Sequence, residues 1–281
     1  MELGSALFWN GLRNEGSQDG EPGMSTIEQH RPMMLPPLMA GQRLDQPTFH
    51  ARYSAMPPET RAELVGGIVY MPSPMRDDHG ETDHLIGGWL FHYQFMTPGV
   101  RGAAGATLKL QQMGEPQPDR HFFIAPEFGG QVAIDAEGYL IGAPDLVVEI
   151  ARSSCAYDLG PKKADYERAK VREYIVVELD PDQVHWFVLR GDRYDKLEPG
   201  DDGIYRSEVF PGLWLDPVAL YTNDPARLIH VLEQGRATPE HAAFVASLEE
   251  RGRAKGVVPS DAQSRPNAVQ DPSASKSVEI S

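Results

Sequence analysis

Pro144-Asp145-Leu146-Val147-Val148-Glu149-Ile150 is a short apolar, β-branched run that carries a carboxylate inside it. Such a run is typical of a buried strand. Burying the Glu149 carboxylate among valines costs several kcal/mol unless a charged group or hydrogen-bond donors meet it. The strand therefore predicts a charged partner for Glu149, either a metal ion or a basic side chain.

A basic candidate follows in the run Asp158-Leu159-Gly160-Pro161-Lys162-Lys163-Ala164-Asp165-Tyr166, which predicts the start of a helix. Lys162 and Tyr166 are four residues apart and share a helix face, whereas Lys163 points about 100° away. A cation is unfavourable near the positive, N-terminal end of a helix dipole. This position favours a functional Lys162 over the alternative, a solvated lysine at a helix start.

A second acid has to come from another strand. Side chains alternate along a strand, so Asp145 and Glu149 share a face but lie about 13 Å apart, too far to bind one Mg²⁺ with ligands at about 2.0–2.1 Å. Asp119 is the best candidate, because it precedes the strand-like run at 121–124. Pro118-Asp119 could instead be only a turn. Asp145, at the strand start, is interpreted as structural or supporting.

Two further segments carry polar side chains. Glu63 precedes Gly66-Gly67, the turn of a predicted hairpin, and is either a further acid of the site or an exposed strand residue. In the acidic run 77–84, His79 and His84 are five residues apart, about 140° round a helix, so they do not make the i, i+4 pair typical of zinc. A solvated helix start is expected there, with His79 as the exception.

The remaining pattern alternates strands and helices. Helices are expected at 45–56, 77–96, 158–170, 225–234 and 239–251, and strands at 63–65, 68–70, 100–103, 106–112, 119–125, 145–151, 173–179 and 184–190. A hairpin is expected within 131–142, with Glu137-Gly138 at its turn, and a short strand after Gly191-Asp192. This mixture predicts an α/β or α+β domain built on one mixed sheet.

The ends of the chain differ from its middle. Residues 1–43 and 253–281 lack a steady hydrophobic period and are expected to be disordered. They flank a predicted domain at 44–222 and a C-terminal helical extension at 223–252. Residues 33–40 are apolar but interrupted by prolines and lack a basic flank, so no signal peptide is expected.

Composition limits the functions. The 281 residues carry a net charge of −15 and one cysteine. That charge argues against a protein held on nucleic acid by a broad basic surface, although a local cationic groove stays compatible with it. No run of about 18 apolar residues predicts a transmembrane helix. Cys155 cannot form an internal disulfide, which fits a cytoplasmic location. With no metal-binding motif around it, Cys155 is interpreted as an ordinary small residue.

Taken together, these segments resemble the Uma-type restriction endonuclease family, a branch of the PD-(D/E)XK nuclease superfamily. The resemblance covers roughly 45–222 and is carried by Glu63–Tyr70, Pro118-Asp119, Pro144–Ile150, Asp158…Lys162…Tyr166 and Glu173–Val177. It implies a restriction-endonuclease-like core, a central mixed β-sheet with helices on both faces. It also implies hydrolysis of DNA phosphodiester bonds with Mg²⁺, or with Mn²⁺ as the second option.

The resemblance further implies roles for single residues. Asp119 and Glu149 match the two metal-binding acids. The superfamily's usual lysine, two residues after the second acid, is absent because position 151 is Ala, and Lys162 looks like its replacement. The supporting residues expected around this catalytic set are Glu63, Asp145, Tyr166 and His79.

Three functions are compatible with these observations. The first is a DNA endonuclease. In it, Mg²⁺ held by Asp119 and Glu149 activates a water molecule for attack on phosphorus, and Lys162 stabilises the negative charge that develops on the phosphate. In the second, the fold is a catalytically inactive binding or regulatory module, which the acidic composition favours. The third hypothesis is a different Mg²⁺ phosphohydrolase. A homodimer is also expected, because one such site cuts one strand at a time.

Overall fold

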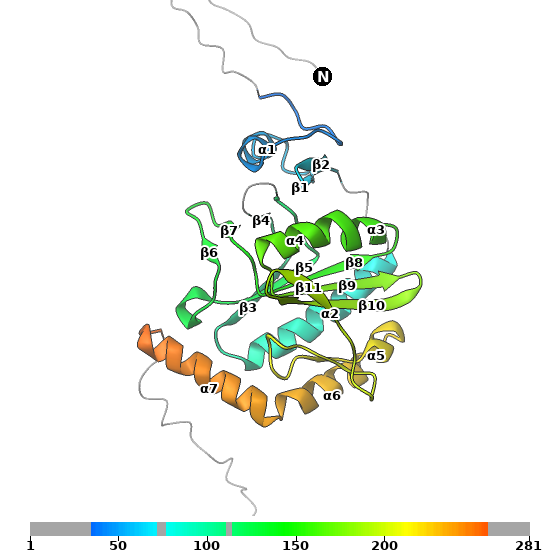
Figure 1. Cartoon of the computed structure of the whole chain (residues 1–281), viewed down its shortest axis with the longest axis vertical. Helices are drawn as coiled ribbons and strands as arrows, with labels where there is room; N and C mark the ends of the chain where they lie inside the picture. The colour runs from blue at the N-terminus through cyan, green and yellow to red at the C-terminus, as the bar shows by residue number, and fades with distance from the viewer. Residues whose placement is uncertain (1–34, 72–76, 111–113, 258–281) are drawn as a thin grey trace, which may run out of the picture. The chain divides into compact units, whose positions relative to one another are not determined.

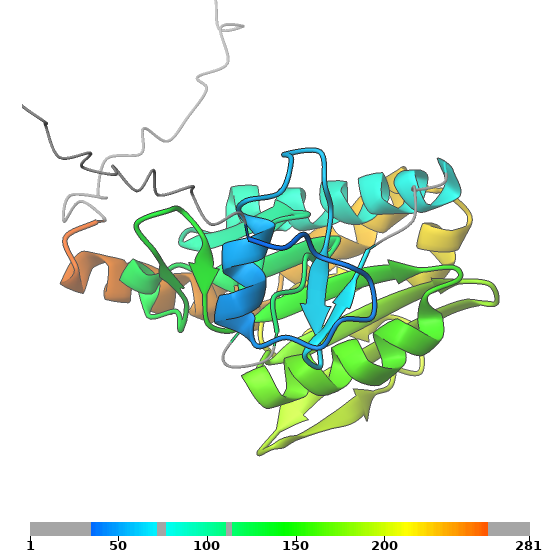
Figure 2. The same cartoon turned by 90° about the horizontal axis from the view of Figure 1, so that it is seen from above.

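The computed structural model describes residues 35–71, 77–110 and 114–257. At its centre lies a six-stranded mixed sheet with the strand order β11-β10-β9-β8-β5-β3 (Figures 1 and 2). Its strands are β3 Val100–Ala104, β5 Arg120–Ile124, β8 Leu146–Ala151, β9 Glu173–Leu179, β10 Asp182–Arg190 and β11 Arg193–Leu197. β8 and β9 pair in parallel, and the other neighbours pair antiparallel. The predicted mixed sheet is confirmed.

The parallel pair requires a crossover, and this crossover carries the predicted lysine helix. It consists of α3 Cys155–Tyr157, a π-helical turn η2 Asp158–Lys162 and α4 Lys163–Ala169. The helix therefore begins three residues before the predicted start at 158. Pro161 lies inside the wide turn. Because proline has no N–H for an α-helical bond, a wider turn is a natural place for it.

The two faces of the sheet have different covers. Figure 1 shows α4 on one face, and α2 Asp77–Met96 with the C-terminal helices on the other. Leu146, Val148 and Ile150 pack on the α2 side. Val147 and Ala151 pack on the α4 side, together with the α4 residue Tyr166. The alternation predicted for this strand is confirmed, and it places Glu149 on the α4 side.

The C-terminal helices are α5 Pro217–Tyr221, α6 Pro225–Arg236 and α7 Pro239–Ala254. α5 was not predicted, nor was the short pair β12 Tyr205–Arg206 and β13 Trp214–Leu215. Gly235 was expected to follow α6 but lies inside it. A Cβ at Gly235 would lie 2.4 Å from the Gly212 carbonyl oxygen, so close packing and not helix termination requires this glycine. Gly252 likewise lies inside α7 and is buried.

Several smaller elements lie on the α4 side. They are α1 Gln46–Tyr53, the hairpin of β1 Glu63–Val65 and β2 Ile68–Tyr70, and a three-stranded sheet of β4 Leu108–Lys109, β7 Leu140–Ile141 and β6 Ala133–Ile134. α1 ends earlier than the expected position 56. Both predicted hairpins are confirmed. The strand expected at 106–112 shortens to two residues, and its positions 111 and 112 lie outside the described residues.

The domain limits differ from the expected ones. Residues 36–43 were assigned to a disordered segment, yet Leu38 is buried and the Gly41 amide donates to the Val69 carbonyl at 2.8 Å. In the extension 223–252, Leu228 and Leu248 belong to the main core. The terminal segments 1–34 and 258–281 lie outside the described residues. Among the helices described, none has the length and apolarity needed to cross a membrane.

One buried acid ties β9 to the chain that follows β12. Glu173 is fully buried and accepts hydrogen bonds from Ser207 Oγ at 2.6 Å, from the Glu208 amide at 2.7 Å and from the Val209 amide at 3.2 Å. Burial raises the pKa of Glu173 to about 7, against the opposing effect of these donors. Its carboxyl group therefore changes charge near neutral pH in the folded protein.

This shift predicts a pH-dependent stability. Because the folded pKa lies above the unfolded one, the contribution of Glu173 to the free energy of unfolding is present at low pH and is lost as pH rises from about 4.5 to about 7. This pH-dependent loss in the free energy of unfolding is about 3 kcal/mol at most. It should be absent in Glu173→Gln when urea unfolding is measured across the same pH range. Glu249→Gln, which alters a partly exposed acid on α7, is the control. The same pH dependence of the free energy of unfolding in wild type and in Glu173→Gln would contradict the assignment.

Candidate functional site

The candidate site lies where β5 begins beside β8. In their antiparallel register Arg120 pairs with Val148, so the next position outward sets Asp119 opposite Glu149. Asp119 Oδ2 accepts a hydrogen bond from the Ile150 amide at 2.7 Å. The backbone of β8 thus anchors Asp119 next to Glu149, as expected for neighbouring strands.

Glu149 has the basic partner that its burial predicts. Its Oε1 accepts from Lys162 Nζ at 3.0 Å and from Tyr166 Oη at 2.8 Å, and all three side chains are buried. Lys162 and Tyr166 share the face of the helical segment that looks at β8. Lys163 points elsewhere, with its Nζ 4.4 Å from the centre of the Phe187 ring.

Three carboxylates surround the Lys162 ammonium. Besides Glu149, Glu63 Oε2 lies 3.3 Å and Asp158 Oδ1 3.7 Å from Nζ, and Lys162 is only 6% exposed. The other oxygen of Glu63 accepts from the Gln117 amide at 2.7 Å. We call Glu63, Asp119, Glu149, Asp158 and Lys162 the acidic cluster. It joins the β1–β2 hairpin, the β5–β8 edge and the crossover.

The cluster contains more acidic groups than basic ones, and burial together with these charges shifts the pKa values of Lys162, Glu149 and Asp158. Burial alone would lower the pKa of Lys162, but Glu149, Glu63 and Asp158 outweigh it and raise that pKa above its ordinary value. Burial raises the pKa of Glu149, which Lys162 partly offsets. Burial also raises the pKa of Asp158, to about 6. The lysine therefore stays an ammonium, and it is the buried cation shared by Glu63, Glu149 and Asp158.

Asp119 and His79 form the solvent-facing edge of the cluster. His79 Nε2 lies 3.3 Å from Asp119 Oδ2, and the two side chains are 18% and 20% exposed. The hydrogen bond to Asp119 raises the pKa of His79, against the effect of burial. His79, which was expected to be the exception within 77–84, therefore contacts Asp119, a predicted site acid.

Asp145 is not in the cluster. Its Oδ2 accepts from the Ile124 amide at 2.8 Å, and its Oδ1 lies 3.2 Å from Arg172 Nη1. These contacts extend the β5–β8 pairing at the opposite end of β8 from the acidic cluster. The structural interpretation of Asp145 therefore fits its place, and a direct role at the candidate site does not.

Two neighbours of Lys162 were not predicted as site residues. Asp158 is one, although its i, i+4 spacing to Lys162 was a readable signal. Tyr157 is the other: its ring centre lies 5.4 Å from Lys162 Nζ and 4.2 Å from that of Tyr70. The Tyr157 ring partly covers the ammonium, and no sequence pattern points to such a contact.

The donor set of the cluster suits a hard cation. Every acid in it offers carboxylate oxygens, the ligands that Mg²⁺ and Mn²⁺ prefer. Within the described residues, no three acids of the cluster bring ligand atoms within 4.8 Å of one another, because they spread around the ammonium. Mg²⁺ is commonly held by one or two carboxylates together with water and substrate phosphate. Asp119 and Glu149 fit that requirement.

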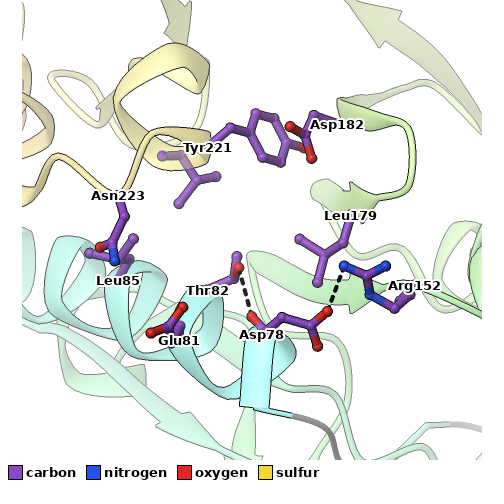
Figure 3. A pocket seen from close by; sticks show the side chains of 10 residues that line it. Asp78, Glu81, Thr82, Leu85, Arg152, Leu179, Asp182, Tyr221 and Asn223 are labelled. Atoms are coloured by element: carbon purple, nitrogen blue, oxygen red, sulfur yellow. Dashed lines mark hydrogen bonds and ion pairs between the residues drawn. The ribbon is translucent and has the colours of Figure 1, made fainter.

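A cavity of about 180 Å³ adjoins the start of α2, which also carries His79. Figure 3 shows Asp78 of α2 facing Arg152, which follows β8, with an Oδ2–Nη2 separation of 2.5 Å. Leu179 lies beside Arg152, and Tyr221 lines the opposite side. Arg152 thus places a partly exposed guanidinium two residues beyond Ile150, the residue that anchors Asp119.

Comparisons with known proteins agree with this fold. A crystal structure from Anabaena variabilis, titled a "putative nuclease belonging to DUF820", aligns with a TM-score of 0.50 and 13% identity. The alignment covers 61% of this chain and 96% of that one, and at this identity it shows the shared fold alone. No curated protein matches. The Uma2 family model, described as "Putative restriction endonuclease", matches residues 47–218. Since that match spans more than half of the sequence, the chain belongs to the Uma2 family.

Proposed function

We propose that this protein is a divalent-metal-dependent endonuclease that hydrolyses phosphodiester bonds of DNA at the acidic cluster. One observation carries the proposal: the Lys162 ammonium lies 3.0 Å from Glu149, on a strand whose neighbour sets Asp119 opposite that acid. Two acids and a lysine at one strand edge are the groups that phosphodiester hydrolysis needs. Family membership supports the same reaction class.

Asp119 and Glu149 are the residues that would hold the ion, Mg²⁺ or Mn²⁺. Bound there, the ion would supply Lewis-acid charge to the phosphate and to the attacking water. Lys162 acts as a fixed positive charge, because its raised pKa makes it a poor proton acceptor at neutral pH. It would stabilise the negative charge that builds on the phosphate oxygens.

The other residues of the site orient these groups. Tyr166 Oη fixes the Glu149 oxygen that Lys162 also contacts. Glu63 is held by the Gln117 amide and contacts Lys162 from the hairpin side. Hydrogen bonds from separate elements therefore set the positions of the acid and the lysine before substrate arrives, which is the arrangement that electrostatic catalysis requires.

A homodimer is part of the proposal, because cleavage of both DNA strands needs two such sites. Phe91, Phe95 and Met96 are exposed large apolar side chains on α2, and such a group is more typical of an interaction surface than scattered single residues are. Light scattering measures the oligomeric state. Paired sites would also release linear plasmid together with nicked circles.

A catalytically inactive binding or regulatory module is the second candidate. The net charge of −15 and the enclosure of Lys162 by three carboxylates favour it, because the lysine then serves only to balance buried acids. In that case DNA is bound without being cut, and substitutions in the acidic cluster leave its binding unchanged.

Nicking of supercoiled plasmid separates the two functions. With Mg²⁺ or Mn²⁺ present, Glu149→Gln and Lys162→Met should lower the nicking rate about 100-fold or more, because each removes a group that stabilises the transition state. Lys163→Ala, which alters the neighbouring lysine outside the cluster, should cut at the wild-type rate. Circular dichroism checks the folding of each variant. No cutting by the folded wild type, or equal cutting by Glu149→Gln, would refute the proposal.

Metal binding can be measured without catalysis. Mg²⁺ should raise the Tm of the wild type by a few degrees, because an ion that binds only the folded state stabilises it. Asp119→Asn should lose this shift. Asp145→Asn, which alters a buried acid outside the cluster, should lower the Tm yet keep the metal-dependent shift. The same shift in Asp119→Asn as in wild type would exclude Asp119 as a ligand.

A further inference from the structure

Three side chains of different chemistry meet on the crossover side of the sheet, outside the acidic cluster. Cys155, Glu178 and His185 each bring one potential ligand atom, and these sulfur, oxygen and nitrogen atoms all lie within 4.8 Å of one another. Within the described residues, no other trio of histidine, cysteine or acidic side chains does so. We call these three residues the Cys-Glu-His group.

Strand register explains how the group assembles. In the β9–β10 hairpin Glu178 pairs with Gln183, and His185 pairs with Val176. Glu178 and His185 are therefore diagonal neighbours on the face that carries Val176, which is the α4 side. Cys155 opens α3 and packs on the same side. Segments more than twenty residues apart in sequence thus converge on one face.

Glu178 links the other two members in the present arrangement. His185 Nε2 lies 2.8 Å from Glu178 Oε2. The hydrogen bonds from His185 and from the Cys155 thiol lower the pKa of Glu178, so its carboxylate is ionised at neutral pH. Burial and the neighbouring Glu178 raise the pKa of Cys155 to about 12, so without a metal the sulfur is a neutral thiol.

We propose that the Cys-Glu-His group binds a divalent transition metal, with Zn²⁺ as the first choice. Zinc is held in proteins by cysteine sulfur, histidine nitrogen and carboxylate oxygen, whereas Mg²⁺ takes oxygen ligands. Ligand atoms about 2.0–2.3 Å from a tetrahedral zinc lie about 3.3–3.8 Å apart. Atoms already within 4.8 Å of one another reach that geometry through small side-chain movements. A water molecule can fill the fourth position.

Binding changes the protonation of the group in a balanced way. The S–H bond of Cys155 breaks, its proton passes to solvent and a sulfur–zinc bond forms, while His185 binds as neutral imidazole. The Glu178 and His185 side chains are 14% and 15% exposed, so an ion can enter from solvent. The donor set differs from that of the acidic cluster, and the two sites therefore select different metals.

The position of the group suggests what the metal would do. α3 runs directly into η2, which carries Asp158 and Lys162. A metal joining Cys155 to the β9–β10 hairpin would fix the start of the segment that delivers the lysine. It would act as a structural clamp beside the candidate site and would take no part in the reaction itself.

Cobalt is the probe that tests this site, because Co²⁺ takes zinc ligands and its thiolate complexes absorb in the near ultraviolet. Cys155 is the sole cysteine of the 281 residues, so a thiolate-to-cobalt band reports on this sulfur alone. Titration of chelator-treated full-length protein should give the band with one equivalent of Co²⁺. Zn²⁺ should abolish the band by displacement, and excess Mg²⁺ should leave it in place.

Variants distinguish a metal site formed by all three residues from binding to the Cys155 thiol alone. Cys155→Ser should lack the band, and Glu178→Gln and His185→Gln should weaken Co²⁺ binding about 10-fold or more. Glu149→Gln, in the acidic cluster, and His230→Gln, on α6, should keep it. Bound Zn²⁺ should also slow the reaction of Cys155 with a thiol reagent in wild-type protein, a measurement that needs no variant. The absence of a stoichiometric band in folded wild type, or its survival unchanged in both Glu178→Gln and His185→Gln, would overturn the proposal.

Discussion

The ion cluster around Lys162 is the interaction on which the rest of the site depends. An ammonium with 6% exposure is stable in a protein interior only because carboxylates from three elements face it. Glu63 belongs to the hairpin, Glu149 to β8 and Asp158 to the crossover. Loss of one partner from such a buried group typically costs about 3–5 kcal/mol, because it leaves the remaining charges uncompensated. The cluster thus couples the fold of this region to its chemistry.

The parallel pairing of β8 and β9 supplies that cluster with its lysine. Parallel strands need a crossover, and here the crossover passes over the face to which Glu149 points. Cys155 and Lys162 lie in the same short stretch of this crossover, one next to the β9–β10 hairpin and the other next to β8. A single topological requirement therefore brings members of an oxygen-rich group of side chains and of a mixed sulfur, nitrogen and oxygen group into one crossover segment.

Local sequence signals were ambiguous where one residue type serves two purposes. Glycine ends helices, but it also permits close contact between backbones. At Gly235 the second use applies, because Gly212 and Trp214 leave no space for a side chain. Asp145 and Glu149 stand on the same strand face, yet Asp145 bonds to the β5 backbone while Glu149 meets the lysine. Which partner a buried acid finds depends on the neighbouring segment and not on the strand that carries it.

The sequence alone determined the features that rest on local spacing. The alternation along 145–151, the shared face of Lys162 and Tyr166, the hairpin at Gly66-Gly67 and the need of Glu149 for a charged partner all follow from the periods of strands and helices. Only the tertiary structure decided which distant groups meet: His79 with Asp119, Glu63 with Lys162, and Cys155 with Glu178 and His185. The physical reason is that strand register and the path of the crossover fix these contacts, and contacts between residues far apart in the chain leave no periodic trace in its sequence.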